Sequence, residues 1–141
     1  MSHNGATNSF RKELLQAAHD FDTHIFKIAL LEGNFGPDLE LYDGSGEVSG
    51  SGYTPGGIQI NVSDDYPRFD LAPNGISAAS VRFDDVHWPT AEVSTNAALI
   101  YNSSNGNKSV MLLNFGRTYQ SSSLNGFRVT FPATTHAVIR I

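Results

Sequence analysis

The segment His24-Ile-Phe-Lys-Ile-Ala-Leu-Leu31 decides the class of fold. From Ile25 onward, every residue of this segment except Lys27 is apolar. A strand with one face in water alternates apolar and polar residues, whereas a strand covered on both faces is apolar almost throughout. We therefore predict that residues 24–31 form a central β-strand that is covered on both faces.

Downstream of this segment, short strand patterns follow one another, separated by turn residues. Residues 58–62 are Ile-Gln-Ile-Asn-Val, the alternation that is typical of a half-buried strand. The Asn105-Gly106 pair inside residues 102–107 is typical of a β-hairpin turn. Further strands are predicted over residues 39–42, 66–71, 76–83, 91–101, 108–115, 127–131 and 137–141.

Upstream of the central strand, residues 9–21 carry the helical pattern of the chain. Ser9 is the predicted N-cap, and Asp20 and Asp22 end the pattern. An apolar stripe at helical spacing is formed by Phe10, Leu14, Leu15 and Ala18. Residues 1–8 are polar and are predicted to form an N-terminal arm.

These patterns together predict a mainly β protein with one N-terminal helix. Short strands at this spacing are typical of a single β-sandwich or a jelly-roll-like barrel of about seven or eight antiparallel strands. The chain has 141 residues, the size of one domain. We expect residues 1–141 to form that domain, with the arm at 1–8, the helix at 9–21 and the sandwich at 24–141.

Composition and charge exclude several classes of function. The net charge is −5 and the nine basic residues are scattered, so the chain lacks the basic stripe of a protein that binds nucleic acid. Apolar runs such as 28–31 are far shorter than the roughly 20 residues that span a membrane. Because residues 1–8 have no apolar core, we expect no secretory signal and a soluble product made in a cytoplasm.

The segment Phe83-Asp-Asp-Val-His-Trp88 is the first candidate for chemistry. A carboxylate beside a histidine could act as a general base, and a tryptophan could stack on a sugar. No nucleophile or second acid is specified by the spacing. We favour the alternative in which Phe83, Val86 and Trp88 belong to the core and the two aspartates cap a turn.

The glycine-rich residues 43–57 do not form a phosphate-binding loop, because they contain no lysine and precede a strand. We predict a mobile or partner-contacting loop there. The chain has no cysteine, and its five histidines are dispersed, so no zinc site is predicted. Asp38, Glu40 and Asp43 do not follow the EF-hand order, although a structural calcium ion stays an alternative.

No residue is assigned to catalysis. The chain contains no G-x-S-x-G elbow, and Gly50-Ser51-Gly52 is only a loop tripeptide. We therefore expect a protein that is not an enzyme, with no catalytic residue, no metal ligand and no cofactor.

The order of segments along the chain resembles a family of small tailed-bacteriophage virion proteins, from about residue 10 to residue 141. The most specific segments are residues 47–57, Glu-Val-Ser-Gly-Ser-Gly-Tyr-Thr-Pro-Gly-Gly, and residues 97–102, Ala-Ala-Leu-Ile-Tyr-Asn. The other matching segments are residues 10–15, 19–22, 26–30, 83–88, 112–116, 127–132 and 137–141.

The resemblance implies a non-enzymatic structural protein of the virion, assembled in the cytoplasm of the host bacterium. The preferred role is a capsid decoration, or cement, protein that binds the major capsid protein and stabilises the shell. A tail, neck or fibre-associated component is the alternative. Other virion proteins would be the partners, a homotrimer or homodimer is compatible, and neither nucleic acid nor membrane is expected as a partner.

Partner-binding residues are expected in loops and among tyrosines, because tyrosine supplies both contact area and a hydrogen bond. The predicted contact residues are Tyr53, Thr54, Pro55, Tyr66 and Tyr119. A carbohydrate-binding module that uses Trp88 and nearby tyrosines as a stacking platform is a less favoured alternative.

Overall fold

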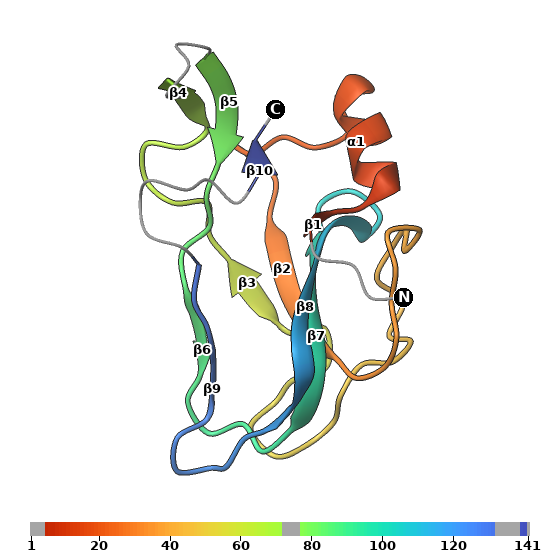
Figure 1. Ribbon diagram of the computed structural model, residues 1–141, viewed down its shortest axis with the longest axis vertical. Coiled ribbons are helices and arrows are strands. Elements are labelled where there is room, and N and C mark those ends of the chain that lie inside the picture. Colours follow the sequence, from red (N-terminus) through yellow and green to blue (C-terminus); the bar gives the residue numbers. More distant parts are fainter. Residues whose placement is uncertain (1–4, 72–76, 132–138, 141) are drawn as a thin grey trace.

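The strands lie in two layers of antiparallel sheet (Figure 1). The computed structural model describes residues 5–71, 77–131 and 139–140. The first layer is a five-stranded sheet in the order β1-β8-β7-β2-β3. Its strands are β1 (Gly5–Ala6), β8 (Lys108–Gln120), β7 (Ser94–Asn102), β2 (Phe26–Leu31) and β3 (Ile58–Ile60).

The second layer consists of two smaller sheets. One has the order β10-β5-β4 and the other pairs β6 with β9. Their strands are β10 (Ile139–Arg140), β5 (Ser77–Val81), β4 (Arg68–Leu71), β6 (Val86–Trp88) and β9 (Phe127–Val129). None of the described sheets closes on itself, so the mainly β prediction is confirmed in its sandwich-like form.

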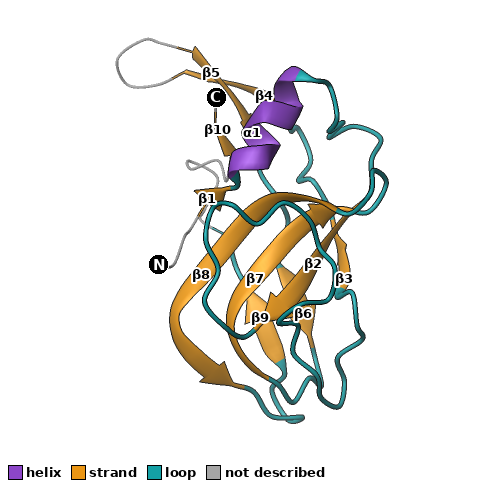
Figure 2. Cartoon of the chain, turned by 90° about the vertical axis from the view of Figure 1, so that its right-hand side faces the viewer, coloured by secondary structure: helices purple, strands orange, loops and turns teal. Residues whose placement is uncertain are grey.

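The central strand β2 is covered on both faces, as predicted. Phe26, Ile28 and Leu30 belong to the core between the layers, and all three are at most 1% exposed. Ala29 and Leu31 point to the opposite face. That face is covered by partly buried residues of the following loop, which are Phe35, Leu39 and Tyr42. Figure 2 shows this sheet from the outside, with β6 and β9 behind it.

The hairpin between β7 and β8 is also confirmed. The amide of Asn105 donates to the carbonyl of Asn102, and the amide of Lys108 donates to that of Asn105. Gly106 and Asn107 adopt φ values of +63° and +57°, which glycine and asparagine tolerate best.

The predicted helix boundaries are wrong at both ends. The helix α1 covers Asn8–Leu15, and its N-cap is Thr7, whose Oγ1 accepts a hydrogen bond of 3.4 Å from the amide of Phe10. The chain leaves the helix because Ala17 has a φ of +57° and the amide of Ala18 turns back to the carbonyl of Glu13. After this reversal His19 is buried, with its Nε2 at 2.9 Å from Oε1 of Glu13.

Residues 5–7 correct the prediction of a separate N-terminal arm. Gly5 and Ala6 pair with Leu112 and Met111 at the edge of the first sheet. Thr7 is fully buried and its hydroxyl is 2.8 Å from that of Ser109. These residues belong to the fold, while residues 1–4 lie outside the described part of the chain.

The strand predictions differ from the structure in further places, and β7 begins at Ser94 rather than at residue 91. Residues 39–42 form only an isolated bridge from Leu41 to Lys108, not a strand. Residues 86–88 form β6, because Val86 and Trp88 point into the core while their backbone pairs with β9. The strand at 108–115 continues to Gln120. Residue 76 and residues 137, 138 and 141 of the predicted strands lie outside the described residues.

Candidate docking surface

A series of aromatic rings leads from the core to the surface at the end of the sandwich where β8 meets β9. Trp88 is 2% exposed and its ring centroid is 6.1 Å from Tyr53 and 6.3 Å from Phe127. The Phe127 ring lies 5.7 Å from Phe115, which lies 6.2 Å from Tyr119. Tyr119 is 38% exposed, so the series ends in solvent.

A bulge in β8 places Phe115 and Tyr119 there. Thr95 of β7 pairs with Tyr119 and Ala97 pairs with Asn114, so β8 contains more residues than β7 between these two pairs. Gly116 has a φ of +81°, and its amide donates a hydrogen bond of 2.8 Å to Oδ1 of Asn114. Such a bulge bends the strand and re-aims its side chains, which explains why residues 116–120 are exposed.

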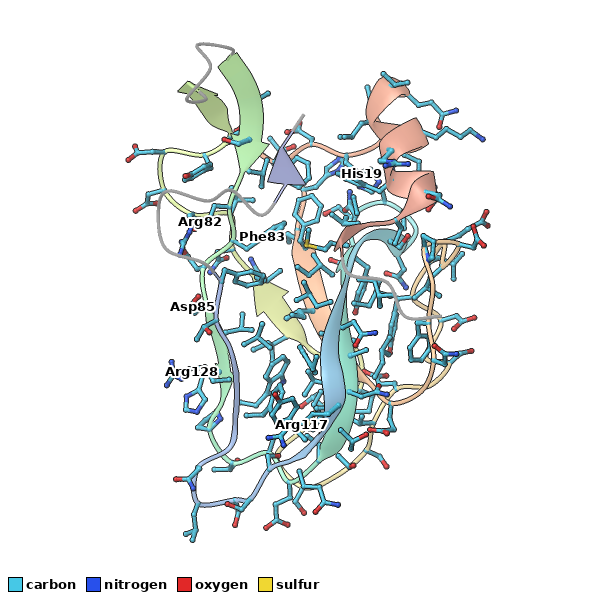
Figure 3. The ribbon with its side chains drawn as sticks, viewed as in Figure 1. His19, Arg82, Phe83, Asp85, Arg117 and Arg128 are labelled. Carbon is cyan, nitrogen blue, oxygen red and sulfur yellow. The ribbon has the colours of Figure 1, made fainter. Side chains whose placement is uncertain are left out.

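Arg117 extends the aromatic series with a positive charge. Its guanidinium carbon lies 4.4 Å from the centroid of the Tyr119 ring, a cation–π contact. Within the described residues, Arg117 forms no ion pair. In Figure 3 it lies near the lower end of β8, on the side facing the second layer, whereas Arg128 lies on the outer side of β9. Arg128 contacts Nδ1 of His87 at 3.3 Å.

A groove of about 340 Å³ runs between these strands. It is lined by Phe115, Tyr119, Phe127, Arg128, Val129 and Thr130, and we call it the β8–β9 groove. Side chains along a strand alternate between its two faces. Because four consecutive residues, 127–130, all line the groove, the groove runs along the edge of β9 rather than over one face of it.

The five predicted contact residues do not form one surface. Tyr119 lies in the groove. Tyr53 is only 7% exposed, so the expectation that it is an exposed contact residue is wrong. Tyr66 is partly buried and its hydroxyl group is buried. Thr54 and Pro55 are exposed in the glycine-rich loop, where a partner contact stays a prediction.

Phe115, Arg117 and Phe127 are not among the contact residues predicted from the sequence. Phe127 alternates with polar residues in the predicted strand 127–131, a pattern that indicates burial, but it is only partly buried. Gly116 was the available signal, since a glycine inside a strand pattern often marks a bulge.

Burial of Tyr53 follows from a cluster that fixes the glycine-rich loop. The carboxylate of Glu47 accepts hydrogen bonds from the hydroxyls of Tyr42 at 2.5 Å and Tyr53 at 2.6 Å, and from the amide of Gly56 at 2.7 Å. The Tyr42 ring stacks on Tyr101 at 4.5 Å, and the hydroxyl of Tyr101 donates to the carbonyl of Gly56.

The tyrosine hydroxyls of this cluster stay protonated and can therefore donate their hydrogen bonds. Burial, together with the charge of Glu47, raises the pKa of the Tyr101 hydroxyl to about 12, and the same causes raise the pKa values of Tyr42 and Tyr53. All three hydroxyls therefore stay protonated donors at neutral pH. The loop is held at several points, which disfavours the mobile alternative and leaves the partner-contacting one as a prediction.

The segment around Trp88 has a structural role. Asp84 accepts a hydrogen bond from the hydroxyl of Ser63 at 2.8 Å, and Asp85 accepts one from the amide of Phe131 at 2.8 Å. The favoured interpretation of Phe83, Val86 and Trp88 as core residues is confirmed. Because Trp88 is buried, it cannot serve as the stacking platform of a sugar site.

A larger hollow of about 660 Å³ lies beside α1, and its lining is polar and of mixed charge, including Lys12, Glu13, Asp38 and Lys108. No group of three or more His, Asp or Glu side chains in the described part of the chain is arranged to hold a metal ion. Within the same residues, the helix is too short and too polar to cross a membrane.

Comparisons with family models, with curated proteins and with solved structures find no match for this chain.

Proposed function

We propose that this protein is a non-enzymatic structural protein of a bacteriophage virion. Its role is to decorate the capsid by binding the major capsid protein through the β8–β9 groove. The resemblance of its segments to small virion proteins supports the class. The single observation that carries the docking role is the exposed pair of Arg117 and Tyr119, which lies beside the partly buried ring of Phe115.

The composition of this surface is that of a protein contact. Tyrosine and arginine are enriched among the residues that dominate binding energy at interfaces. The Phe115 ring contacts the Tyr119 ring edge-on and, through Phe127, connects it to the core. Binding therefore loses little side-chain freedom, which favours affinity.

The fixed glycine-rich loop supports the same role. Glu47 holds the loop through Tyr53 and Gly56, so Thr54 and Pro55 are presented in a defined conformation. The charged fraction of the chain is only 16%, and the loop residues Thr54 and Pro55 would make neutral contacts. Such contacts are less sensitive to salt than exposed ion pairs.

The test is co-sedimentation of the purified protein with shells of the major capsid protein from its source virus, with the bound copies counted. A decoration protein binds saturably at a high copy number per shell. Binding only to tailed particles, at a few copies each, would contradict decoration and support the neck or tail alternative. No binding to either particle would contradict the proposal as a whole.

Two variants test whether shell binding depends on the β8–β9 groove. Tyr119→Ala removes the exposed ring at the groove, whereas Leu15→Ala removes an apolar side chain that is 92% exposed on α1. We expect Tyr119→Ala to weaken shell binding at least tenfold and Leu15→Ala to leave it unchanged. Equal binding by both variants would contradict docking through the groove.

A further inference from the structure

The sheet formed by β6 and β9 has only two strands, whereas the first layer has five. Among the described residues, β9 pairs only with β6, so its other edge has no strand partner. The facing strand β8 pairs along one side with β7, but on its other side β1 reaches only Met111 and Leu112. Both strands that border the β8–β9 groove thus have an unpaired edge in the described structure.

An unpaired edge is a template for another strand. Its free N–H and C=O groups can pair with an extended segment of a second chain, and alternate side chains of that segment then enter pockets on one face. The groove runs along the edge of β9 over residues 127–130. Phe115 and Tyr119 of β8 line the opposite wall, where they would meet the inward side chains of an added strand.

The positive charge of Arg117 indicates which side chains a segment bound in the groove would carry. The Arg117 guanidinium contacts the Tyr119 ring and has no ion pair within the described residues. An arginine that stacks on an aromatic ring keeps its N–H donors available, and a carboxylate is the side chain that fits them best.

We propose that the β8–β9 groove binds an extended segment of a partner protein that adds as a strand to the free edge of β9. This segment has apolar side chains on its inward face and a carboxylate that pairs with Arg117. The added strand would widen the β6–β9 sheet from two strands to three and cover Phe115 and Tyr119. This inference rests on the proposed docking function and names the chemistry of its partner.

The probes are short synthetic peptides that alternate valine with aspartate, valine with lysine, or valine with serine. Binding to the full chain is measured by titration, and the site is located by the hydrogen exchange of backbone amides. We expect saturable binding of the aspartate peptide, with slower exchange in residues 127–130. The lysine peptide should bind at least tenfold more weakly.

Two N-methylated forms of the aspartate peptide distinguish main-chain pairing from attraction between opposite charges. Methylation of alternate backbone nitrogens removes the main-chain donors along one edge of the peptide. Of the two possible methylation patterns, one should abolish binding and the other should leave it intact. If neither methylated peptide loses binding, the strand-addition inference is overturned.

Charge reversal tests the role of Arg117. Arg117→Glu should weaken binding of the aspartate peptide at least tenfold and improve binding of the lysine peptide. The matched control is Arg11→Glu on α1, which changes the net charge equally at an exposed position and should leave both affinities unchanged. Equal effects of the two variants would overturn the carboxylate pairing.

The outcomes distinguish this inference from the proposed function. If the protein binds shells but no peptide enters the groove, the strand-addition inference is wrong and the docking function stands. If a single-stranded oligonucleotide binds the groove more tightly than the aspartate peptide, the inference is wrong, because aromatic rings and arginine then serve base stacking.

Discussion

The hydroxyl of Tyr53 donates a hydrogen bond of 2.6 Å to Oε2 of Glu47, a residue that lies six positions earlier in the chain. The same hydroxyl accepts a hydrogen bond of 3.0 Å from the amide of Leu30 in β2. Through these two bonds the glycine-rich loop is attached to the centre of the first sheet. Glu47 is therefore predicted to be a major source of stability outside the apolar core.

Replacing Glu47 with alanine should lower the free energy of unfolding by about 2–4 kcal/mol, because two tyrosine hydroxyls and an amide lose a charged acceptor. Glu47→Gln, which keeps one acceptor oxygen, should cost about half as much. The measurement is urea-induced unfolding. Glu92→Ala, at an exposed carboxylate, should stay within about 0.5 kcal/mol of the native chain. If Glu47→Ala also lowered the free energy of unfolding by no more than about 0.5 kcal/mol, the role assigned to the cluster would be contradicted.

Alkaline pH should destabilise the fold through the tyrosine cluster. In the folded chain the pKa of Tyr101 is raised from its ordinary value of 10.0 to about 12. A raised pKa means that the unfolded chain loses its proton first, so stability is complete below pH 10 and declines as the pH rises towards 12. The measurement is the free energy of unfolding against pH. We expect Tyr101→Phe to show a smaller decline, and an identical decline would contradict this assignment.

Acid should weaken the contact between α1 and the β7–β8 hairpin. Burial lowers the pKa of His19 below its ordinary value of 6.5, and although Glu13 opposes this shift, burial is the larger effect. Its Nε2 bonds to Glu13 Oε1 at 2.9 Å, while its Nδ1 accepts from Nδ2 of Asn102 at 3.1 Å. His24 and Lys108 also lie close enough to disfavour a charge on His19.

A lowered pKa means that the unfolded chain takes up the proton first. The free energy of unfolding should therefore decline as the pH falls through 6.5 and level off once His19 is protonated in the folded chain as well. His19→Gln removes this titration but keeps a polar side chain. Urea unfolding on both sides of pH 6.5 should show a smaller decline in the free energy of unfolding for the variant than for the native chain. An equal decline in both proteins would contradict the prediction.

Two glycines with similar backbone angles should respond differently to alanine. At Gly57, with a φ of +78°, a Cβ atom would lie 1.8 Å from the carbonyl oxygen of Ile28. At Gly44, with a φ of +85°, nothing lies within 4 Å of that atom. Gly57→Ala should cost at least about 3 kcal/mol and Gly44→Ala about 1–2 kcal/mol, as seen by thermal unfolding. Similar losses at both sites would mean that β2 does not approach the loop this closely.

The regular strands could be predicted because their side-chain pattern is local. The apolar run at 26–31 already indicated that β2 is buried on both faces, and the Asn105-Gly106 pair indicated the hairpin. The early end of α1 could not be predicted, because Ala17 adopts a positive φ without a glycine to signal it. The residues after this turn make a distant contact, since His19 is buried against Asn102, 83 positions later in the chain.

The candidate site was only partly predictable for the same reason. Tyr119 was selected because tyrosine is common at interfaces, and it does lie at the surface. Tyr53 has the same side chain, yet Glu47 and Leu30 hold it inside. Phe115 and Phe127 become neighbours only when β8 and β9 are placed in opposite layers, which no local pattern specifies.

We propose that the protein docks on a partner in the virion through the β8–β9 groove. The decisive measurement is the hydrogen exchange of the protein bound to capsid shells, compared with that of the free protein. We expect slower exchange in residues 113–120 and 127–130, and unchanged exchange in α1. Unchanged exchange in the groove, with protection confined to α1 or to another surface, would contradict it.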